Sequence, residues 1–117
     1  MLPIKRRVRK ESFEKIIKDG FFIHANYFYL KALNRNDEKP SLFGFVVPNK
    51  IKKTSVGRHL IKRKMSAVVE KFLLKVRLGF SCVFFLKKDI FTPSYKEIEK
   101  EILELLKKAK ILNEKGF

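Results

Sequence analysis

Residues 55–86 read SVGRHLIKRKMSAVVEKFLLKVRLGFSCVFFL, a helical pattern that runs directly into a strand pattern. Within the first part, apolar residues recur at steps of four, three, four and four, which is the spacing of one buried helix face. They are Ile61, Met65, Val68, Phe72 and Val76. We therefore expect a helix over residues 55–77 that Thr54 or Ser55 caps. Gly79 closes this helix, and SCVFFL follows as a buried strand.

The segments on either side of this unit supply the other elements. ESFEKIIKDG at residues 11–20 predicts a helix that ends at its glycine, and FFIHANYFYLKAL predicts extended chain with a break at Ala25-Asn26. SLFGFVVP, residues 41–48, predicts a short buried strand, and Thr92-Pro93-Ser94 opens a last helix. The order of helix, two or three strands, long helix, strand and helix predicts an α+β two-layer sandwich over a single domain, residues 1–117.

The charge of the chain is large and unevenly placed. Its 117 residues hold 28 Lys and Arg against 12 Asp and Glu, a net charge of +16. Between Glu38 and Asp89 the one acid is Glu70. A 45% share of hydrophobic residues, with twelve Phe, argues against a disordered basic tail. A folded domain with one strongly basic side favours a polyanionic partner, and nucleic acid is the leading candidate.

The basic stretch falls on the predicted long helix and the loop before it. His59, Arg63, Ser66 and Glu70 are expected roughly opposite the apolar stripe. The cations that flank this side or precede the helix are Lys50, Lys52, Lys53, Arg58, Lys62 and Lys64. Backbone N–H groups and the helix dipole at a helix start favour an anion. We therefore interpret this stretch as a phosphate-binding surface.

Several other classes of protein are disfavoured. The apolar stripe of the long helix is needed for the core, which argues against a helix lying on a membrane, and the longest apolar runs are too short to span one. The lone Cys82 excludes an internal disulfide and fits a reducing cytoplasm. The segment after the basic start, residues 11–20, is not an apolar run, so we expect no secretion signal.

The histidines do not indicate a metal site. His24 and His59 are the two histidines of the chain, and neither stands in a metal-ligand spacing or beside a carboxylate cluster. We expect the protein alone to hold no metal or other cofactor. Metal-assisted hydrolysis of phosphodiesters must then be supplied by another molecule.

The segment SVGRHLIKRK resembles the Arg-Asn-Arg motif of the bacterial ribonuclease P protein subunit. The matching positions are Val56, Arg58, Ile61, Lys62 and Arg63, whereas His59 and Leu60 stand where the family has Asn and Arg. The rest of the chain is similar in the same order: KRRVRKESFEKIIKDG, LFGFVVPNKI, SCVFFLKK and SYKEIEKEILELLKKAKIL. The resemblance therefore spans nearly all of the chain.

The resemblance implies a fold and a function. The implied fold is a four-stranded mixed sheet with helices, in the order α-β-β-β-α-β-α and with a left-handed β-α-β crossover. The implied function is that of the protein subunit of ribonuclease P, an endoribonuclease that removes the 5′ leader from precursor tRNA and whose catalyst is a large RNA with Mg²⁺. The implied partners are this catalytic RNA and precursor tRNA, in the cytoplasm and without a membrane.

The resemblance, together with the positions of the residues in the predicted elements, gives two sets of expected site residues. The set that faces the catalytic RNA is Lys50, Lys52, Lys53, Arg58, His59, Lys62 and Arg63. The set that forms a cleft for the single-stranded leader is Phe13, Ile17, Tyr27, Tyr29, Lys31, Lys87 and Lys88. In the second strand, alternation places Tyr27, Tyr29 and Lys31 on one face, where a base can stack on an aromatic ring while lysine holds a phosphate. None of these residues is expected to be catalytic.

One alternative remains open at this point. A structural RNA-binding protein of the ribosomal type would also carry a basic helix on a small α+β domain. The feature that separates the two functions is the leader cleft, which a structural RNA-binding protein would lack.

Overall fold

The computed structural model describes residues 2–88 and 94–113. Its main elements follow the predicted order: α1 (Phe13–Asp19), β1 (Phe21–His24), β2 (Phe28–Asn34), β3 (Leu42–Val46), α2 (Ser55–Lys71), β4 (Phe80–Leu86) and α3 (Tyr95–Lys108). Short 3-10 turns cover Ile4–Arg6, Lys10–Ser12 and Leu73–Lys75. The predicted opening of the last helix at Thr92 and Pro93 lies outside the described residues, and Ser94 caps α3 by accepting from the N–H of Glu97.

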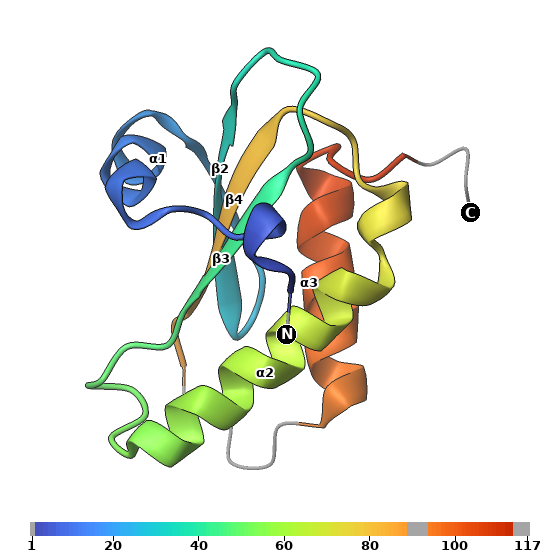
Figure 1. Ribbon diagram of the computed structural model, residues 1–117. Coiled ribbons are helices and arrows are strands. Elements are labelled where there is room, and N and C mark those ends of the chain that lie inside the picture. Colours follow the sequence, from blue (N-terminus) through green and yellow to red (C-terminus); the bar gives the residue numbers. More distant parts are fainter. Residues whose placement is uncertain (1, 89–93, 114–117) are drawn as a thin grey trace.

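The four strands form one mixed sheet in the order β1-β2-β4-β3. Strands β1 and β2 pair antiparallel, as do β2 and β4, whereas β3 and β4 pair in parallel. Helix α2 connects the two parallel strands, so β3, α2 and β4 form a β-α-β unit (Figure 1). The predicted α+β fold with a four-stranded mixed sheet is confirmed.

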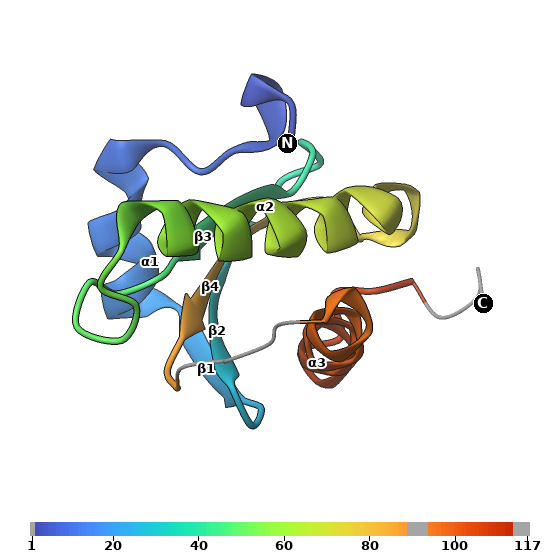
Figure 2. The same cartoon turned by 90° about the horizontal axis from the view of Figure 1, so that it is seen from below.

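The two faces of the sheet are covered unequally. Helices α2 and α3 lie together on one face, while the shorter α1 lies on the other (Figures 1 and 2). The larger core lies under α2 and α3 and includes Phe28, Phe84, Met65 and Ile102, all 0% exposed. The smaller cluster under α1 is built from Val8, Ile16 and Val83. Part of the α1 face therefore remains accessible.

Helix α2 ends earlier than its apolar pattern predicts. The expected helix ran to residue 77, but α2 stops at Lys71 and a 3-10 turn follows. Beyond that turn Val76 makes a β-bridge to Leu112, and the N–H of Arg77 donates to the carbonyl of Ile111. The C-terminal segment thus takes over the backbone hydrogen bonds, which lets Phe72 and Val76 reach the core without helical backbone.

Gly79 has a different role from the predicted helix stop. Its φ of 87° lies in the left-handed region, and a Cβ there would stand 2.5 Å from the carbonyl oxygen of Asp37. Its N–H donates to the carbonyl of Lys39 and its own carbonyl accepts from Arg35. Gly79 therefore joins the loop after β2 to the start of β4, where no other residue fits without strain.

The N-terminal segment crosses the molecule beside β3. The N–H of Val8 donates to the carbonyl of Phe43 at 3.0 Å, and Arg7 forms a parallel bridge with the same residue. Leu2 is 1% exposed, and its N–H donates to the hydroxyl of Ser66 on α2. The segment therefore connects the edge of the sheet to the long helix. Among the described residues, no helix combines the length and the apolarity that a membrane span needs.

Candidate nucleic-acid interface

The start of α2 is fixed by its own side chains. Thr54 precedes the helix, and its hydroxyl accepts a hydrogen bond from the N–H of Gly57 at 3.1 Å. This confirms Thr54 as the cap, one of the two predicted residues. A Cβ on Gly57 would lie 2.7 Å from the same hydroxyl oxygen, so glycine allows the cap to close.

Arg58 holds the loop before α2 in place. Its Nη1 donates to the carbonyls of Lys52 and Lys53 at 3.0 and 2.9 Å, and to Oδ1 of Asn49 at 3.2 Å. Arg58 is half-buried as a result. It positions the basic loop, a role that the sequence did not predict.

The other residues of the predicted catalytic-RNA set differ in exposure. Lys50, Lys53, His59 and Arg63 are exposed, whereas Lys52 and Lys62 are half-buried. Together with Arg58 we call these seven residues the α2 surface. No Asp or Glu occurs between Glu38 and Glu70, so the sequence around this surface offers no local acid to neutralise it.

Ser66 does not belong to the exposed side of α2. The prediction placed it opposite the apolar stripe, but its side chain is buried, with 2% of the residue exposed. The N-terminal segment covers this flank of the helix, and the Ser66 hydroxyl accepts the N–H of Leu2 at 3.0 Å. The prediction was wrong because helical periodicity says nothing about a segment that arrives from elsewhere in the chain.

The opposite face of the sheet carries a row of aromatic rings. The rings of Tyr29 and Phe85 are stacked, with centroids 4.6 Å apart and planes inclined by 4°. Phe22 lies 5.0 Å from Tyr29, and His24 packs edge-on against Phe22 at 4.2 Å. These four residues, from β1, β2 and β4, we call the aromatic face. Phe22 is 42% exposed, so part of the row is open to solvent.

Two lysines flank the aromatic face. Lys31 Nζ lies 5.5 Å from the centroid of the Phe22 ring and donates to the carbonyl of Ile17 at 3.1 Å. Lys87 Nζ lies 3.4 Å from Nδ1 of His24. Aromatic rings with lysines beside them suit the bases and phosphates of single-stranded nucleic acid.

Phe13 and Ile17 of α1 border this face to different degrees. Phe13 is half-buried against the cluster of Val8, Ile16 and Val83. Its ring tip lies 3.0 Å from where a Cβ on Gly44 would stand, so the missing side chain makes room for the ring. Ile17 is 46% exposed. Phe13 therefore contributes to the smaller core as well as to the edge of the face.

Tyr27 lies on the other side of the sheet from Tyr29. It precedes β2 and packs against the larger core, and its N–H donates to Oε1 of Glu101 on α3 at 2.7 Å. The alternation that predicted a shared face holds within a strand and fails for a residue in the bend before it. The prediction that Tyr27, Tyr29 and Lys31 share one face is wrong for Tyr27.

Lys87 and Lys88 follow the end of β4. The backbone N–H of Lys87 donates to the carbonyl of Tyr27 at 2.9 Å, which extends the pairing of β2 and β4 by one bond. Lys88 is exposed. Within residues 2–88 and 94–113, no group of three or more His, Cys, Asp or Glu residues is placed to hold a metal ion. Burial raises the pKa of the Cys82 thiol.

Comparison with known proteins decides between the two functions that the sequence left open. The family model described as Ribonuclease P matches residues 2–110. The chain belongs to the bacterial ribonuclease P protein family. It is therefore a protein component of ribonuclease P, the RNA-catalysed endoribonuclease that processes the 5′ end of precursor tRNA.

Individual relatives agree over nearly the whole chain. The ribonuclease P protein component of a Pseudanabaena species is 30% identical, over 97% of this chain and 98% of its own length. That of Alkaliphilus oremlandii is 33% identical over 97% of each chain. The solved ribonuclease P protein of Staphylococcus aureus superposes with a TM-score of 0.81 at 20% identity, over 95% of this chain and all of its own. This last match supports the fold.

The sequence missed three residues of the aromatic face of this ribonuclease P protein. Phe22 and His24 alternate in FFIH, so they had to share one face of β1, but the pattern does not say which face. Phe84 and Phe85 are adjacent, and the pairing of β4 decides that Phe84 enters the core while Phe85 faces Tyr29. In the strand register Tyr29 lies opposite both His24 on β1 and Phe85 on β4, and this pairing places the rings in one row.

Proposed function

We propose that this ribonuclease P protein is a single RNA-binding domain that binds two RNAs with two separate surfaces. The α2 surface binds the catalytic RNA, and the aromatic face with Lys31 and Lys87 binds the single-stranded 5′ leader of precursor tRNA. The observation that carries this proposal is the stacked pair of Tyr29 and Phe85, of which Phe85 packs against the smaller cluster on the sheet face away from α2. A structural RNA-binding protein needs one basic surface and has no use for this second one.

The α2 surface suits a folded RNA because its positive residues are concentrated in a stretch of sequence without Asp or Glu. Arg63 and Lys53 extend from a helix and a loop whose backbone is held by Thr54 and Arg58. Cations on a fixed backbone bind phosphates with little loss of conformational freedom. Release of counterions from the RNA then gives the binding free energy its steep dependence on salt.

The aromatic face suits an unpaired strand because bases stack on rings without a fixed sequence. Phe22 is accessible at the edge of the sheet, and Tyr29 lies at the centre of the row. Lys31 stands beside Phe22 and Lys87 beside His24, where they could bind the phosphates of a passing strand. Phe13, Ile17 and Lys88 border this path, and Tyr27 does not take part.

The metal of the reaction belongs, in this proposal, to the RNA. The RNA subunit catalyses the ribonuclease P reaction, so the Mg²⁺ of the reaction is held by that RNA. The protein contributes positive charge and substrate contacts. No residue of the chain is assigned a catalytic role. The reducing cytoplasm suggested by the buried thiol of Cys82 is the compartment in which we place the protein.

A comparison of precursor and mature tRNA tests the assignment of the aromatic face. Tyr29→Ala should weaken binding of precursor tRNA to the holoenzyme by about 1–3 kcal/mol, the usual loss for one stacked base. Binding of mature tRNA should hardly change, because it has no leader. The measurement is the dissociation constant of each tRNA with holoenzyme reconstituted from protein and catalytic RNA.

Two control variants make this comparison specific. Tyr29→Phe keeps the stacking ring and should bind precursor tRNA almost as the parent does. Tyr95→Ala removes an exposed tyrosine from the start of α3, on the other side of the sheet, and should leave both affinities unchanged. Equal losses for precursor and mature tRNA with Tyr29→Ala would refute the leader assignment.

A further inference from the structure

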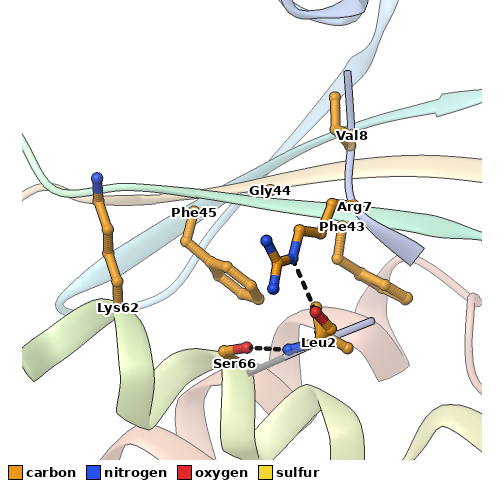
Figure 3. Close-up of a pocket in the computed structure, with 8 residues that line it drawn as sticks. All are labelled: Leu2, Arg7, Val8, Phe43, Gly44, Phe45, Lys62 and Ser66. Carbon is orange, nitrogen blue, oxygen red and sulfur yellow. Dashed lines mark hydrogen bonds between the residues drawn. The ribbon is translucent and has the colours of Figure 1, made fainter. Parts of the chain in front are cut away.

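A pocket separate from the aromatic face lies between the N-terminal segment, β3 and α2 (Figure 3). Its volume is about 180 Å³, and it is lined by Leu2, Arg7, Val8, Phe43, Gly44, Phe45, Lys62 and Ser66. None of these residues is acidic. The two cations among them come from two different elements, the N-terminal segment and α2.

The pocket is built by fixed contacts and is not a chance gap. The N–H of Leu2 donates to the buried hydroxyl of Ser66 at 3.0 Å, and Arg7 Nε donates to the carbonyl of Leu2 at 2.7 Å. The N–H of Val8 donates to the carbonyl of Phe43 at 3.0 Å. Three hydrogen bonds therefore hold the N-terminal segment as one wall, against β3 on one side and α2 on the other.

The lining combines the aromatic rings of Phe43 and Phe45 with two cations. Figure 3 shows the Phe45 ring between the Lys62 ammonium and the Arg7 guanidinium. Nε is the one guanidinium nitrogen of Arg7 that makes a hydrogen bond within the described residues, so both terminal nitrogens remain available. No described residue pairs with the Lys62 ammonium. Two such cations beside an apolar hollow suit a ligand with a flat ring and an anionic group.

The volume limits the ring to a small one. An apolar cavity of roughly 150 Å³ in another protein holds one benzene molecule. A pocket of about 180 Å³ therefore accepts one six-membered heterocycle. If that ring is the base of a nucleotide, the ribose and phosphate lie outside the pocket, beside Lys62 and Arg7.

We propose that this pocket takes one unstacked pyrimidine base of the catalytic RNA, whose phosphate pairs with Lys62 and Arg7. The inference rests on the proposed assignment of α2 to the catalytic RNA, because Lys62 belongs both to the α2 surface and to the pocket. Phosphate contacts along α2 would bring the RNA backbone past the opening. A base inserted beside Phe45 adds a contact that depends on shape as well as on charge.

Titration of the full-length protein with uridine 5′-monophosphate tests the pocket directly. Nuclear magnetic resonance should show shifts centred on Phe43, Phe45 and Ser66. Ribose 5-phosphate, which has the same phosphate without a base, should bind at least several-fold more weakly. Equal binding of the two compounds, or shifts centred on Tyr29 and Phe85, would overturn the proposal.

Matched variants identify the anion contact. Lys62→Gln should weaken binding of uridine 5′-monophosphate by about fivefold, the upper range for one exposed ion pair. Lys71→Gln removes the same charge from the last turn of the same helix, where lysine pairs with Glu99, and should leave this affinity unchanged. Thermal unfolding of both variants verifies that the N-terminal wall stays in place. Equal affinities for the two variants would exclude Lys62 as the phosphate contact and overturn the proposal.

Competition against the catalytic RNA separates this inference from the proposed function. At a concentration equal to its dissociation constant, uridine 5′-monophosphate should weaken assembly about twofold, whereas ribose 5-phosphate at the same concentration should not. If Arg63→Ala weakens assembly and the nucleotide does not compete, the α2 assignment stands and the pocket proposal fails. If the nucleotide fills the pocket but Arg63→Ala leaves assembly unchanged, the α2 assignment fails.

Discussion

Helices α2 and α3 pack against each other on one face of the sheet, yet their charged side chains are arranged in opposite ways. In α3 the charges are paired: Lys108 contacts Glu104 one turn away at 3.1 Å, and Glu99 contacts Lys71, the last residue of α2, at 3.3 Å. In α2 the first acid is Glu70, at the far end of the helix from the basic loop. Both helices contain several lysines, so their number does not distinguish the two.

We infer from this contrast that cations without acids nearby in the sequence mark an RNA-binding helix better than the number of lysines does. Lysines that alternate with glutamates satisfy one another and produce little field at the distance of an RNA phosphate. Cations without acids nearby keep their counterions until a polyanion replaces them. Helix α3 therefore contributes packing to the domain, whereas α2 contributes packing on one side and, in the function that we propose, phosphate contacts on the other.

Charge reversal in the two helices should have the largest and most unequal effect. Arg63→Glu should reduce affinity for the catalytic RNA by about 10- to 100-fold at moderate salt, because a phosphate contact becomes a repulsion. Lys108→Glu changes the net charge by the same amount and should reduce affinity less than about threefold. Filter binding over a range of salt concentrations measures both, and the slope against salt should fall with Arg63→Glu. Similar losses in the two variants would show that the binding is diffuse.

The sequence predicted the elements better than their ends. The apolar spacing of α2 is real, and Ile61, Met65 and Val68 are all buried. The same spacing continues through Phe72 and Val76 on backbone that is no longer helical, because residues 111–113 pair with it. A pattern of side chains cannot show where a distant segment supplies hydrogen bonds.

For the candidate site, the sequence likewise predicted residues within single elements but not the contacts between elements. Motif and charge located the α2 surface, and alternation within β2 located Tyr29 and Lys31. The partners of Tyr29 on β1 and β4 depend on register, and Tyr27 leaves the pattern because it lies in a bend. The loop-holding role of Arg58 requires carbonyl directions that no residue pattern records.

Removal of a buried acid from α3 should have the next largest effect, on stability. Glu101 is 8% exposed, and its Oε1 accepts the N–H groups of Tyr27 and Phe28. Glu101→Ala leaves these donors without a partner and should lower the free energy of unfolding by about 1–3 kcal/mol. Glu104→Ala removes an exposed acid of the same helix and should cost well under 1 kcal/mol. Urea denaturation of both variants provides the comparison, and equal costs would mean that Glu101 has no structural role.

Substitution of the two arginines of α2 should affect different properties: Arg58→Ala should change both stability and RNA affinity, and Arg63→Ala mainly RNA affinity. Arg58→Ala removes the bonds that hold the loop carbonyls and should lower the free energy of unfolding by about 1 kcal/mol, and it should weaken binding of the catalytic RNA as well. Arg63→Ala should weaken RNA binding with a change in stability below about 0.5 kcal/mol, as for exposed positions in general. Unfolding and RNA affinity are measured on the same two proteins. A fully stable Arg58→Ala protein would contradict the positioning role.

The smallest expected effect extends the contrast between paired and unpaired charge to the loop after β2. There the Arg35 guanidinium hydrogen-bonds the Asp37 carboxylate at 3.0 Å and holds the pKa of that carboxyl below its usual value of 3.8. Because the folded pKa is lowered, this contribution to stability is present above the ordinary pKa of aspartate and is lost as the pH falls below it.

Asp37→Asn keeps an acceptor for the N–H of Lys39 but cannot titrate. The difference in unfolding free energy between parent and Asp37→Asn should therefore be constant from pH 7 to about 5 and shrink below about pH 4. Arg63→Gln leaves the Arg35–Asp37 pair intact and should show no such pH-dependent difference from the parent. A difference between parent and Asp37→Asn that does not change with pH would show that the pair contributes nothing through its charge.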